Sequence, residues 1–359
     1  MKKLLAILLI IATLICLLAA CDTTDTQNSD GGTSDTTPPN EDTNLPATPV
    51  DYDLWIGHVR VTSANQNDVL GDGSVVYVGN NESGTLKLNN ANINTIFVPE
   101  SEEGEYSFGI YTDMESLVLE LKGISRLTAE NTPDMGIAVN DLTVNGDGTI
   151  EVCGNVFGLS ATNLVVNSGT VTATSAKNEQ AVVSIGIFAG ETITVKGGTL
   201  NGSAGTFLGD FCYGVYAMGN IEISGGVVNA GLDTAFTAVG LISSAKIKVA
   251  GGEVSAYGLD DAINCVEFEL ANGTVKAESL DFSTDGVCRL VNKFTVGGGS
   301  LEAELLAKGE TAVPVIFSGD IQFADGFTPS IKAGTGAEFA SDISDYASYD
   351  YKDVYIVIQ

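Results

Sequence analysis

The chain is poor in the residues that most often carry catalysis. It contains one histidine, His58, and three arginines, Arg60, Arg126 and Arg289, among 359 residues. With a single histidine remote from other candidate groups, no Ser–His or Cys–His nucleophile can be assembled. The six cysteines include no CxxC pair and no zinc-type spacing. These absences argue against nucleophilic hydrolases and structural zinc modules.

Positive charge is also scarce. Sixteen Lys and Arg face 46 Asp and Glu, which gives a formal net charge of −30 at pH 7. Such a chain repels polyanions unless cations bridge them, so nucleic acid is not an expected partner. The charge favours solubility, and it gives no information about the fold.

One long apolar run is present, and it lies at the N-terminus. Lys2 and Lys3 precede a run from Leu4 to Leu18, and Leu18-Ala19-Ala20-Cys21 then places small residues before a cysteine. This pattern predicts a signal peptide over residues 1–20. The alternative, an uncleaved transmembrane helix, is disfavoured because the run is short for a bilayer span.

The four residues Leu18-Ala19-Ala20-Cys21 resemble the bacterial lipobox. The resemblance implies that Cys21 is acylated and becomes the first residue of a lipoprotein. Two or more acyl chains anchor a protein stably, whereas one alone is marginal. We therefore expect an exported protein held by its lipid at the outer face of the bacterial cell membrane.

Residues 21–50 have the composition of a linker. Residues 22–50 hold eight Thr and four of the eight prolines of the chain, and they lack aromatic residues, Lys and Arg. Such a segment buries too little apolar surface to fold. We expect a disordered stalk between the anchor and the folded body.

Residues 51–98 differ from the segment that follows. Residues 54–61 alternate about Gly57-His58, which predicts a β-hairpin. Together with 61–65 and 69–73, the stretch 52–57 resembles a recurring module in surface proteins of gut Firmicutes. We interpret it as an N-terminal β cap, because the first coil of a repeat stack otherwise exposes an unpaired strand edge.

A glycine-punctuated repeat fills residues 99–325. Each unit has an apolar-x-apolar strand, a glycine turn, a second short alternation and a third strand of the form Gly-apolar-x-small. The first strands begin at Leu142, Leu164, Ile193, Ile221, Ile247, Phe268 and Phe294. The period of two within each strand predicts that one face points inward.

Three short strands per unit of ~25 residues predict an all-β fold, a right-handed parallel β-helix of eight or nine coils. A lone coil cannot fold, because ordering its backbone costs roughly 25–50 kcal/mol, whereas its inward side chains return only about 9–18 kcal/mol. The acidic, tyrosine-rich residues 326–359 break the pattern and are expected to form a C-terminal cap.

The repeat block resembles clostridial surface proteins described as carbohydrate-binding β-helices, which are relatives of the pectate lyase superfamily. The resemblance covers roughly residues 105–325 and rests on the pattern of the repeat. It implies a non-catalytic carbohydrate-binding or adhesion module at the cell surface. Two alternatives stay open: a Ca²⁺-dependent polysaccharide lyase, and a structural or protein-interaction stalk.

Enzymatic relatives of this fold use carboxylates that this chain matches only in part. Asp260-Asp261 resembles the paired aspartates of polygalacturonases, but one coil later the chain has Asp285 and no histidine. A lyase site needs Ca²⁺ and an arginine base, for which Arg289, four residues after Asp285, is the candidate. The alternative is an ordinary surface arginine beside acidic neighbours.

Carboxylates and aromatic residues give two candidate binding sites. Asp260, Asp261 and Asp285 recur at near-coil intervals, as expected for a Ca²⁺ site or for a solvated acidic face. Ile187 and Ala189 should point inward, which turns Phe188 outward. Tyr216 should be outward one coil later.

With Tyr213 nearby, Phe188 and Tyr216 are the candidate carbohydrate contacts. The alternative is that the loops near 175–185 and 203–212 cover them. Cys153, Cys212, Cys265 and Cys288 are expected to be buried free thiols, although a disulfide between stacked positions is open. We expect a monomer whose partners are the membrane and a cell-surface glycan.

Overall fold

The computed structural model describes residues 48–100, 106–127, 131–176, 183–205, 211–231, 237–280, 287–306, 315–345, 349 and 353–359. The chain divides into two units, 1–50 and 51–359. The second unit contains every described strand. Among the described residues there is no α-helix and only one 3₁₀ turn, Ala337–Phe339. The predicted all-β class is therefore confirmed.

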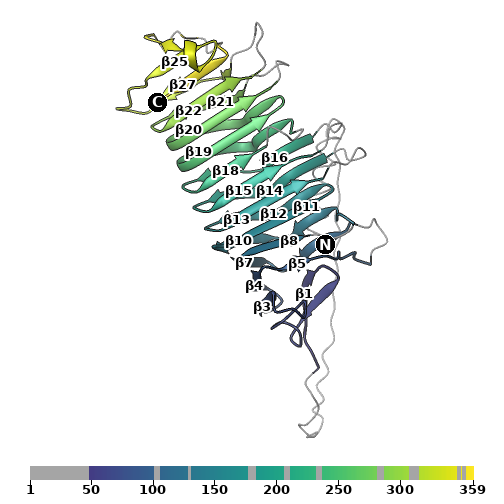
Figure 1. Ribbon diagram of the computed structural model, residues 1–359. Helices are drawn as coiled ribbons and strands as arrows, with labels where there is room; N and C mark the ends of the chain where they lie inside the picture. Colours follow the sequence, from purple (N-terminus) through teal and green to yellow (C-terminus); the bar gives the residue numbers. More distant parts are fainter. Residues whose placement is uncertain are drawn as a thin grey trace, which may run out of the picture. The chain divides into compact units, whose positions relative to one another are not determined.

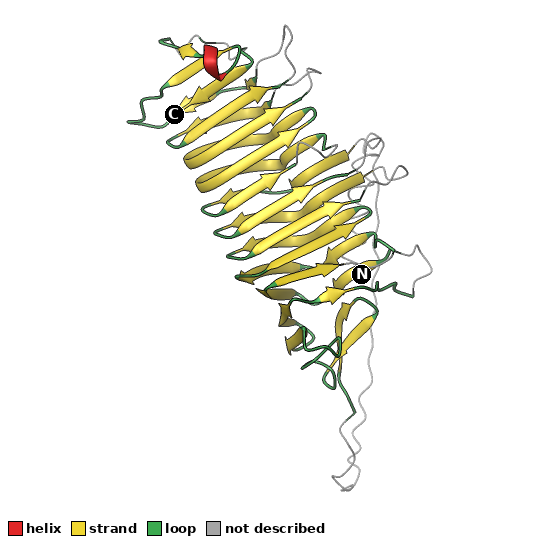
Figure 2. Ribbon diagram, in the orientation of Figure 1, coloured by secondary structure: helices red, strands yellow, loops and turns green. Residues whose placement is uncertain are grey.

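The strands stack as three parallel sheets that wind round a common interior (Figures 1 and 2). The first sheet carries the apolar-x-apolar strands of the repeat. Its successive rungs are β4 (Ser83–Asn89), β7 (Ser116–Lys122), β10 (Asp141–Gly146), the second half of β12 (Phe157–Val166), the second half of β14 (Val183–Val195), β17 (Ile221–Ile223), the middle of β19 (Val239–Gly258) and of β20 (Asp261–Ser279), the second half of β21 (Cys288–Val296), and β24 (Ile321–Phe323).

The second sheet follows the glycine turns. Its rungs are β5 (Asn92–Ile93), β8 (Ile124–Leu127), β11 (Thr149–Gly154), β13 (Thr170–Ser175), β15 (Thr199–Ser203), β18 (Val227–Ala230), the last parts of β19 and β20, and β22 (Ser300–Leu305). The predicted turn conformation is confirmed, because Gly226 and Gly252 have φ values of 75° and 78°, which favour glycine.

The third sheet returns the chain to the next coil. Its rungs are β6 (Phe108–Thr112), β9 (Met135–Ala138), the first parts of β12 and β14, β16 (Phe211–Ala217), the first parts of β19, β20 and β21, and β23 (Ile316–Ser318). All three sheets keep parallel pairing from coil to coil. The predicted parallel β-helix is confirmed.

A single apolar core fills the interior along the stack. Leu164, Ile193 and Ile221 occupy one inner column of the first sheet and are at most 1% exposed. The third sheet contributes Ile187 and Ala189, both in the same core cluster. Alternation along each strand places these side chains inside, as the sequence pattern predicts.

A column of glycines lets the third sheet lie against the end of the second. A Cβ built on Gly186 would come within 2.3 Å of the Ser203 backbone nitrogen, and one on Gly214 within 2.4 Å of the Gly231 nitrogen. Real side chains do not occupy such space, so only glycine fits there. Gly240 takes this position in the coil after Gly214, and the buried residues Ala262 and Val287 take it in the two coils that follow.

The N-terminal cap is a hairpin, as predicted at Gly57-His58. β1 (Asp51–Ile56) pairs antiparallel with β2 (Val59–Thr62) and, on its other edge, with β6. β3 (Val75–Gly79) pairs antiparallel with β4. Parallel stacking begins at β4, because it pairs with β7 in parallel register from Ser83 to Asn89. The first coil thus lies inside the segment that the sequence assigned to the cap.

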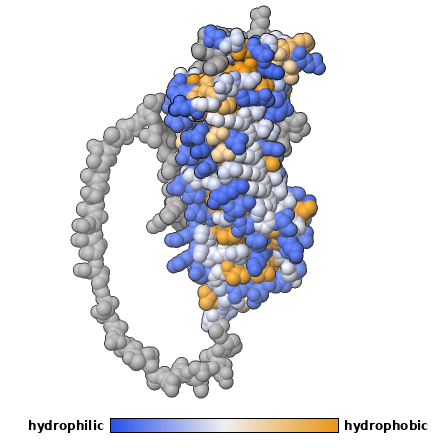
Figure 3. All heavy atoms as spheres, turned by 90° about the vertical axis from the view of Figure 1, so that its left-hand side faces the viewer, coloured by the Kyte–Doolittle hydropathy of each residue, from blue (hydrophilic) through white to orange (hydrophobic). Residues whose placement is uncertain are grey.

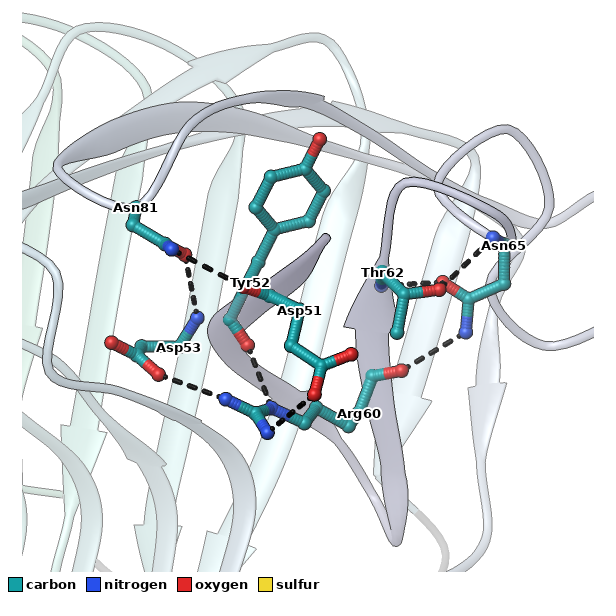
Figure 4. A network of polar contacts seen from close by, with 7 residues as sticks. All are labelled: Asp51, Tyr52, Asp53, Arg60, Thr62, Asn65 and Asn81. Carbon is teal, nitrogen blue, oxygen red and sulfur yellow. Dashed lines mark hydrogen bonds and ion pairs between the residues drawn. The ribbon is translucent and has the colours of Figure 1, made fainter. Parts of the chain in front are cut away.

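A polar network fixes the cap hairpin (Figure 4). The Arg60 guanidinium donates to the Tyr52 carbonyl oxygen at 3.1 Å and forms ion pairs with Asp51 at 2.9 Å and Asp53 at 3.1 Å. The Asp53 amide donates to the Asn81 side chain at 3.1 Å. The guanidinium carbon of Arg60 also lies 5.0 Å from the centre of the Trp55 ring, which is a cation–π contact.

The C-terminal end is closed mainly over the second sheet. β27 (Tyr355–Ile358) pairs antiparallel with β22 and with β25 (Ile331–Gly334), which in turn pairs with β26 (Ser341–Asp342). The predicted final strand is therefore present. In the view of Figure 3, residues of intermediate and hydrophilic character cover the middle of the stack, and hydrophobic residues gather toward its two ends.

Candidate functional site

The outer face of the third sheet carries two continuous rows of side chains. The first row is Phe108, Met135, Phe157, Ile185, Tyr213, Val239 and Asp261. The second row is Tyr111, Ala138, Ser160, Phe188, Tyr216, Ile242, Asn264 and Arg289. The apolar members of both rows lie outside the central core cluster. Neighbours in a row are separated by one strand spacing, about 4.8 Å.

The N-terminal part of these rows is buried, although it faces away from the core. Phe157 is 2% exposed, Ile185 is 1% exposed and Phe188 is fully buried. The expectation that Phe188 is an exposed carbohydrate contact is therefore wrong. Its outward direction was inferred from alternation, but alternation does not tell whether an outward side chain is covered. Residues 177–182 and 206–210 of the loops considered as its cover lie outside the described residues.

Tyr213 and Tyr216 come together on β16, as the sequence suggests. Their ring centroids lie 5.4 Å apart at an interplanar angle of 75°, and Tyr216 also contacts Phe188 at 5.5 Å. The Tyr216 hydroxyl lies 3.0 Å from the Ser244 hydroxyl. Both tyrosines are partly exposed. The buried rings of Phe157 and Phe188 also contact each other. The aromatic contacts therefore run from these two buried rings to the partly exposed tyrosines.

The environment of Tyr213 keeps its hydroxyl protonated. The pKa of Tyr213 is raised to about 12, mainly by burial and to a smaller extent by the neighbouring Tyr216, Cys212 and Asp261. A neutral phenol both donates and accepts a hydrogen bond. The side chain therefore offers an apolar ring and a neutral polar group at the same place.

Beyond Val239 the two rows become polar. Asp261 is 5% exposed and accepts a hydrogen bond of 2.8 Å from the Asn264 side-chain amide. On the next strand Arg289 is in register with Asn264. Carboxylate, amide and guanidinium groups thus follow the two tyrosines along one face of the sheet. The change coincides with the place where Ala262 replaces the glycine of the earlier coils.

The predicted Ca²⁺ ligands are only partly within the described residues. Asp261 is buried, whereas the neighbouring Asp260 is exposed. Asp285 lies outside the described residues. Among the residues that the structure describes, no group of three or more His, Cys, Asp or Glu side chains is placed to hold a metal ion. The Ca²⁺ site stays a prediction.

The remaining candidate groups have structural surroundings. His58 accepts or donates a 2.8 Å hydrogen bond with the Thr95 hydroxyl on the cap. Cys153, Cys212, Cys265 and Cys288 are free thiols, and all except Cys153 are buried. Burial raises the pKa of Cys265 to about 12 and that of Cys288 higher still. Such thiols are poor nucleophiles, because the reactive form is the thiolate.

The sequence analysis missed Phe157, Ile185 and Asn264 as members of this face. A signal for them exists: each coil places an outer residue directly before the third-strand glycine and another two residues after it. Tyr213 and Tyr216 flank Gly214 in this way, and Asp261 and Asn264 flank Ala262.

Cys21, the predicted acylation site, lies outside the described residues. Within the described part of the chain, no helix has the length and apolar character needed to span a bilayer. Comparison with family models, with curated proteins and with solved structures found no match to this chain.

Proposed function

We propose that the protein is a cell-surface module that binds polysaccharide without cleaving it, through the third-sheet face around Tyr213 and Tyr216. The observation that carries the proposal is the order in which side chains follow one another along this face. Two touching, partly exposed tyrosines are followed along the same two rows by Asp261, Asn264 and Arg289.

This combination suits a sugar chain. Aromatic rings pack against the apolar C–H face of a pyranose, and planar polar groups hydrogen-bond its hydroxyls. The rows cross the strands, so a ligand that contacts both the tyrosines and Asn264 extends along the axis of the stack. The rigid sheet holds these groups in place, with Val239 and Ile242 on the one rung between the tyrosines and Asp261 and Asn264, so little ordering is needed on binding.

The test is a glycan array with the full chain purified in detergent, run with and without added Ca²⁺. Tyr216→Ala removes the ring that contacts both Phe188 and Tyr213. We expect binding to fall at least about tenfold, or about 1.4 kcal/mol.

Phe339→Ala is the matched control, because Phe339 is an aromatic residue with 73% exposure outside this face. Equal loss in both variants would contradict the proposal, as would a wild-type chain that binds no glycan. Dependence on Ca²⁺ would support the predicted metal site at Asp260, Asp261 and Asp285.

The location at the cell surface is part of the same proposal. Its support is the Lys2-Lys3 start, the apolar run and the residues that end at Cys21. In cells fed a labelled fatty acid, the wild-type chain should carry the label and Cys21→Ser should not. Label retained by the variant would refute acylation at Cys21.

A Ca²⁺-dependent lyase remains the enzymatic alternative, favoured by one observation. Arg289 lies on the same face as Asp261, one strand from Asn264. A lyase would release unsaturated products from a uronic-acid polymer, and Arg289→Ala would abolish them. If no product forms from a broad panel of such polymers, the lyase alternative is excluded and the proposal of binding without cleavage stands.

A further inference from the structure

The outer face of the second sheet contains a neutral stretch in a strongly acidic protein. We call Thr170, Thr172, Thr199, Asn201 and Asn229 the neutral ladder. These residues lie on β13, β15 and β18, in parallel register from rung to rung. The outer positions of these three strands carry no charged side chain. Glu151 borders the ladder on β11 and Glu253 borders it on β19.

Hydrogen bonds join the central column of the ladder in one direction. The Asn229 side-chain amide donates to the Asn201 Oδ1 at 2.7 Å, and the Asn201 amide donates to the Thr172 Oγ1 at 3.0 Å. All three side chains are partly exposed. Bonds aligned in this way polarise one another, so the groups at the ends of the column become a better acceptor and a better donor.

The column leaves hydrogen-bonding capacity unused. An amide has two donors and an oxygen with two lone pairs, and a hydroxyl has one donor. Within the described part of the chain, the Asn229 Oδ1 accepts no bond, and the Thr172 hydroxyl donates none. In the same part of the chain, one side-chain N–H of each asparagine forms no hydrogen bond. These groups repeat at the strand spacing of about 4.8 Å.

We propose that the neutral ladder is a second binding face, for a neutral polymer rich in hydroxyl groups that lies along the axis of the stack. Hydroxyls both donate and accept, so they can meet the donor and the acceptor ends of the column. An uncharged ligand also avoids the repulsion that a net charge of −30 imposes on polyanions. The proposal does not depend on the tyrosine face, which lies on the third sheet.

The experiment measures retention of the full chain, purified in detergent, on insoluble neutral polysaccharides: cellulose, mannan, xylan and starch. The test variant is the double substitution Asn201→Asp with Asn229→Asp, which keeps shape but removes donors and adds charge. Thr172→Val is a second test variant, because it removes the hydroxyl and keeps a residue that favours strands.

The matched control is Asn145→Asp with Asn167→Asp. These two asparagines form the same amide-to-amide contact, at 3.0 Å, on the outer face of the first sheet. Tyr216→Ala is included to separate this face from the tyrosine face.

We expect both ladder variants to bind one of the neutral polysaccharides at least about tenfold more weakly than the control does. Three results would overturn the proposal. These are equal loss in the ladder and control variants, no loss in the ladder variants, and no retention of the wild-type chain on any of the four polymers. If Tyr216→Ala alone loses binding, the ligand uses only the tyrosine face.

Discussion

Gly214 shows how one missing side chain sets the distance between two sheets. Its hydrogen faces the Gly231 backbone nitrogen, at a place where a Cβ would stand 2.4 Å away. The glycine pattern in the sequence predicts the third strand, but it does not show that glycine is needed there for close approach. The residues that flank this glycine, Tyr213 and Tyr216, are turned outward on the face proposed to bind.

Gly214→Ala should destabilise the protein by about 2–3 kcal/mol, because the backbone it meets cannot move without disturbing two sheets. Urea unfolding followed by circular dichroism measures the change. Gly297→Ala is the control, since the nearest atom to a Cβ there is 3.5 Å away. Equal stability of the two variants would disprove the close approach.

Tyr213 should make stability fall at alkaline pH. Its pKa is raised to about 12 in the folded protein, against an ordinary value of 10. Between these values the unfolded chain loses the proton and the folded protein keeps it, so the stabilisation present below pH 10 disappears as pH rises through 12. Tyr213→Phe should therefore show a shallower decline in unfolding free energy from pH 9 to 12. An unchanged slope would mean that the phenol is not held neutral.

At the scale of the elements, strand direction and inward alternation could be predicted from the sequence. The inner positions of Ile187 and Ala189, the hairpin at Gly57-His58 and the final strand are all found. Whether an outward residue is covered depends on contacts with distant segments, which alternation does not encode. For that reason the burial of Phe188 and of Asp261 could not be predicted.

Arg60 should contribute more to the stability of the N-terminal cap hairpin than Arg126 contributes to the stability of the stack. Arg60 contacts Asp51, Asp53 and the Trp55 ring, whereas among the described residues Arg126 forms an ion pair only with Glu151. Exposed ion pairs contribute about 0–1 kcal/mol each, and a cation–π contact contributes about 0.5–1 kcal/mol.

Arg60→Met should therefore lower the unfolding free energy by about 1–2 kcal/mol, and Arg126→Met by less than about 1 kcal/mol. Urea titration at low salt measures both variants. An equal effect would show that the contacts of the cap add nothing beyond a single surface ion pair.

At the scale of the whole molecule, a stack of parallel coils gives long, regular faces. The third sheet places aromatic and polar groups in two rows, and the second sheet places uncharged groups in a ladder. The repeat pattern predicts such faces but not which of them meets a ligand. That choice follows from partial exposure at Tyr213 and Tyr216, since their neighbours earlier in the rows are buried.

Hydroxyl-radical footprinting of the full chain, with and without a glycan found on the array, tests the central claim most directly. It reports the solvent exposure of individual aromatic side chains. The account predicts protection of Tyr213 and Tyr216 when the glycan is bound, with Tyr106 and Phe339 unchanged. Unchanged reactivity of both tyrosines in the saturated complex, or equal protection of all four side chains, would contradict it.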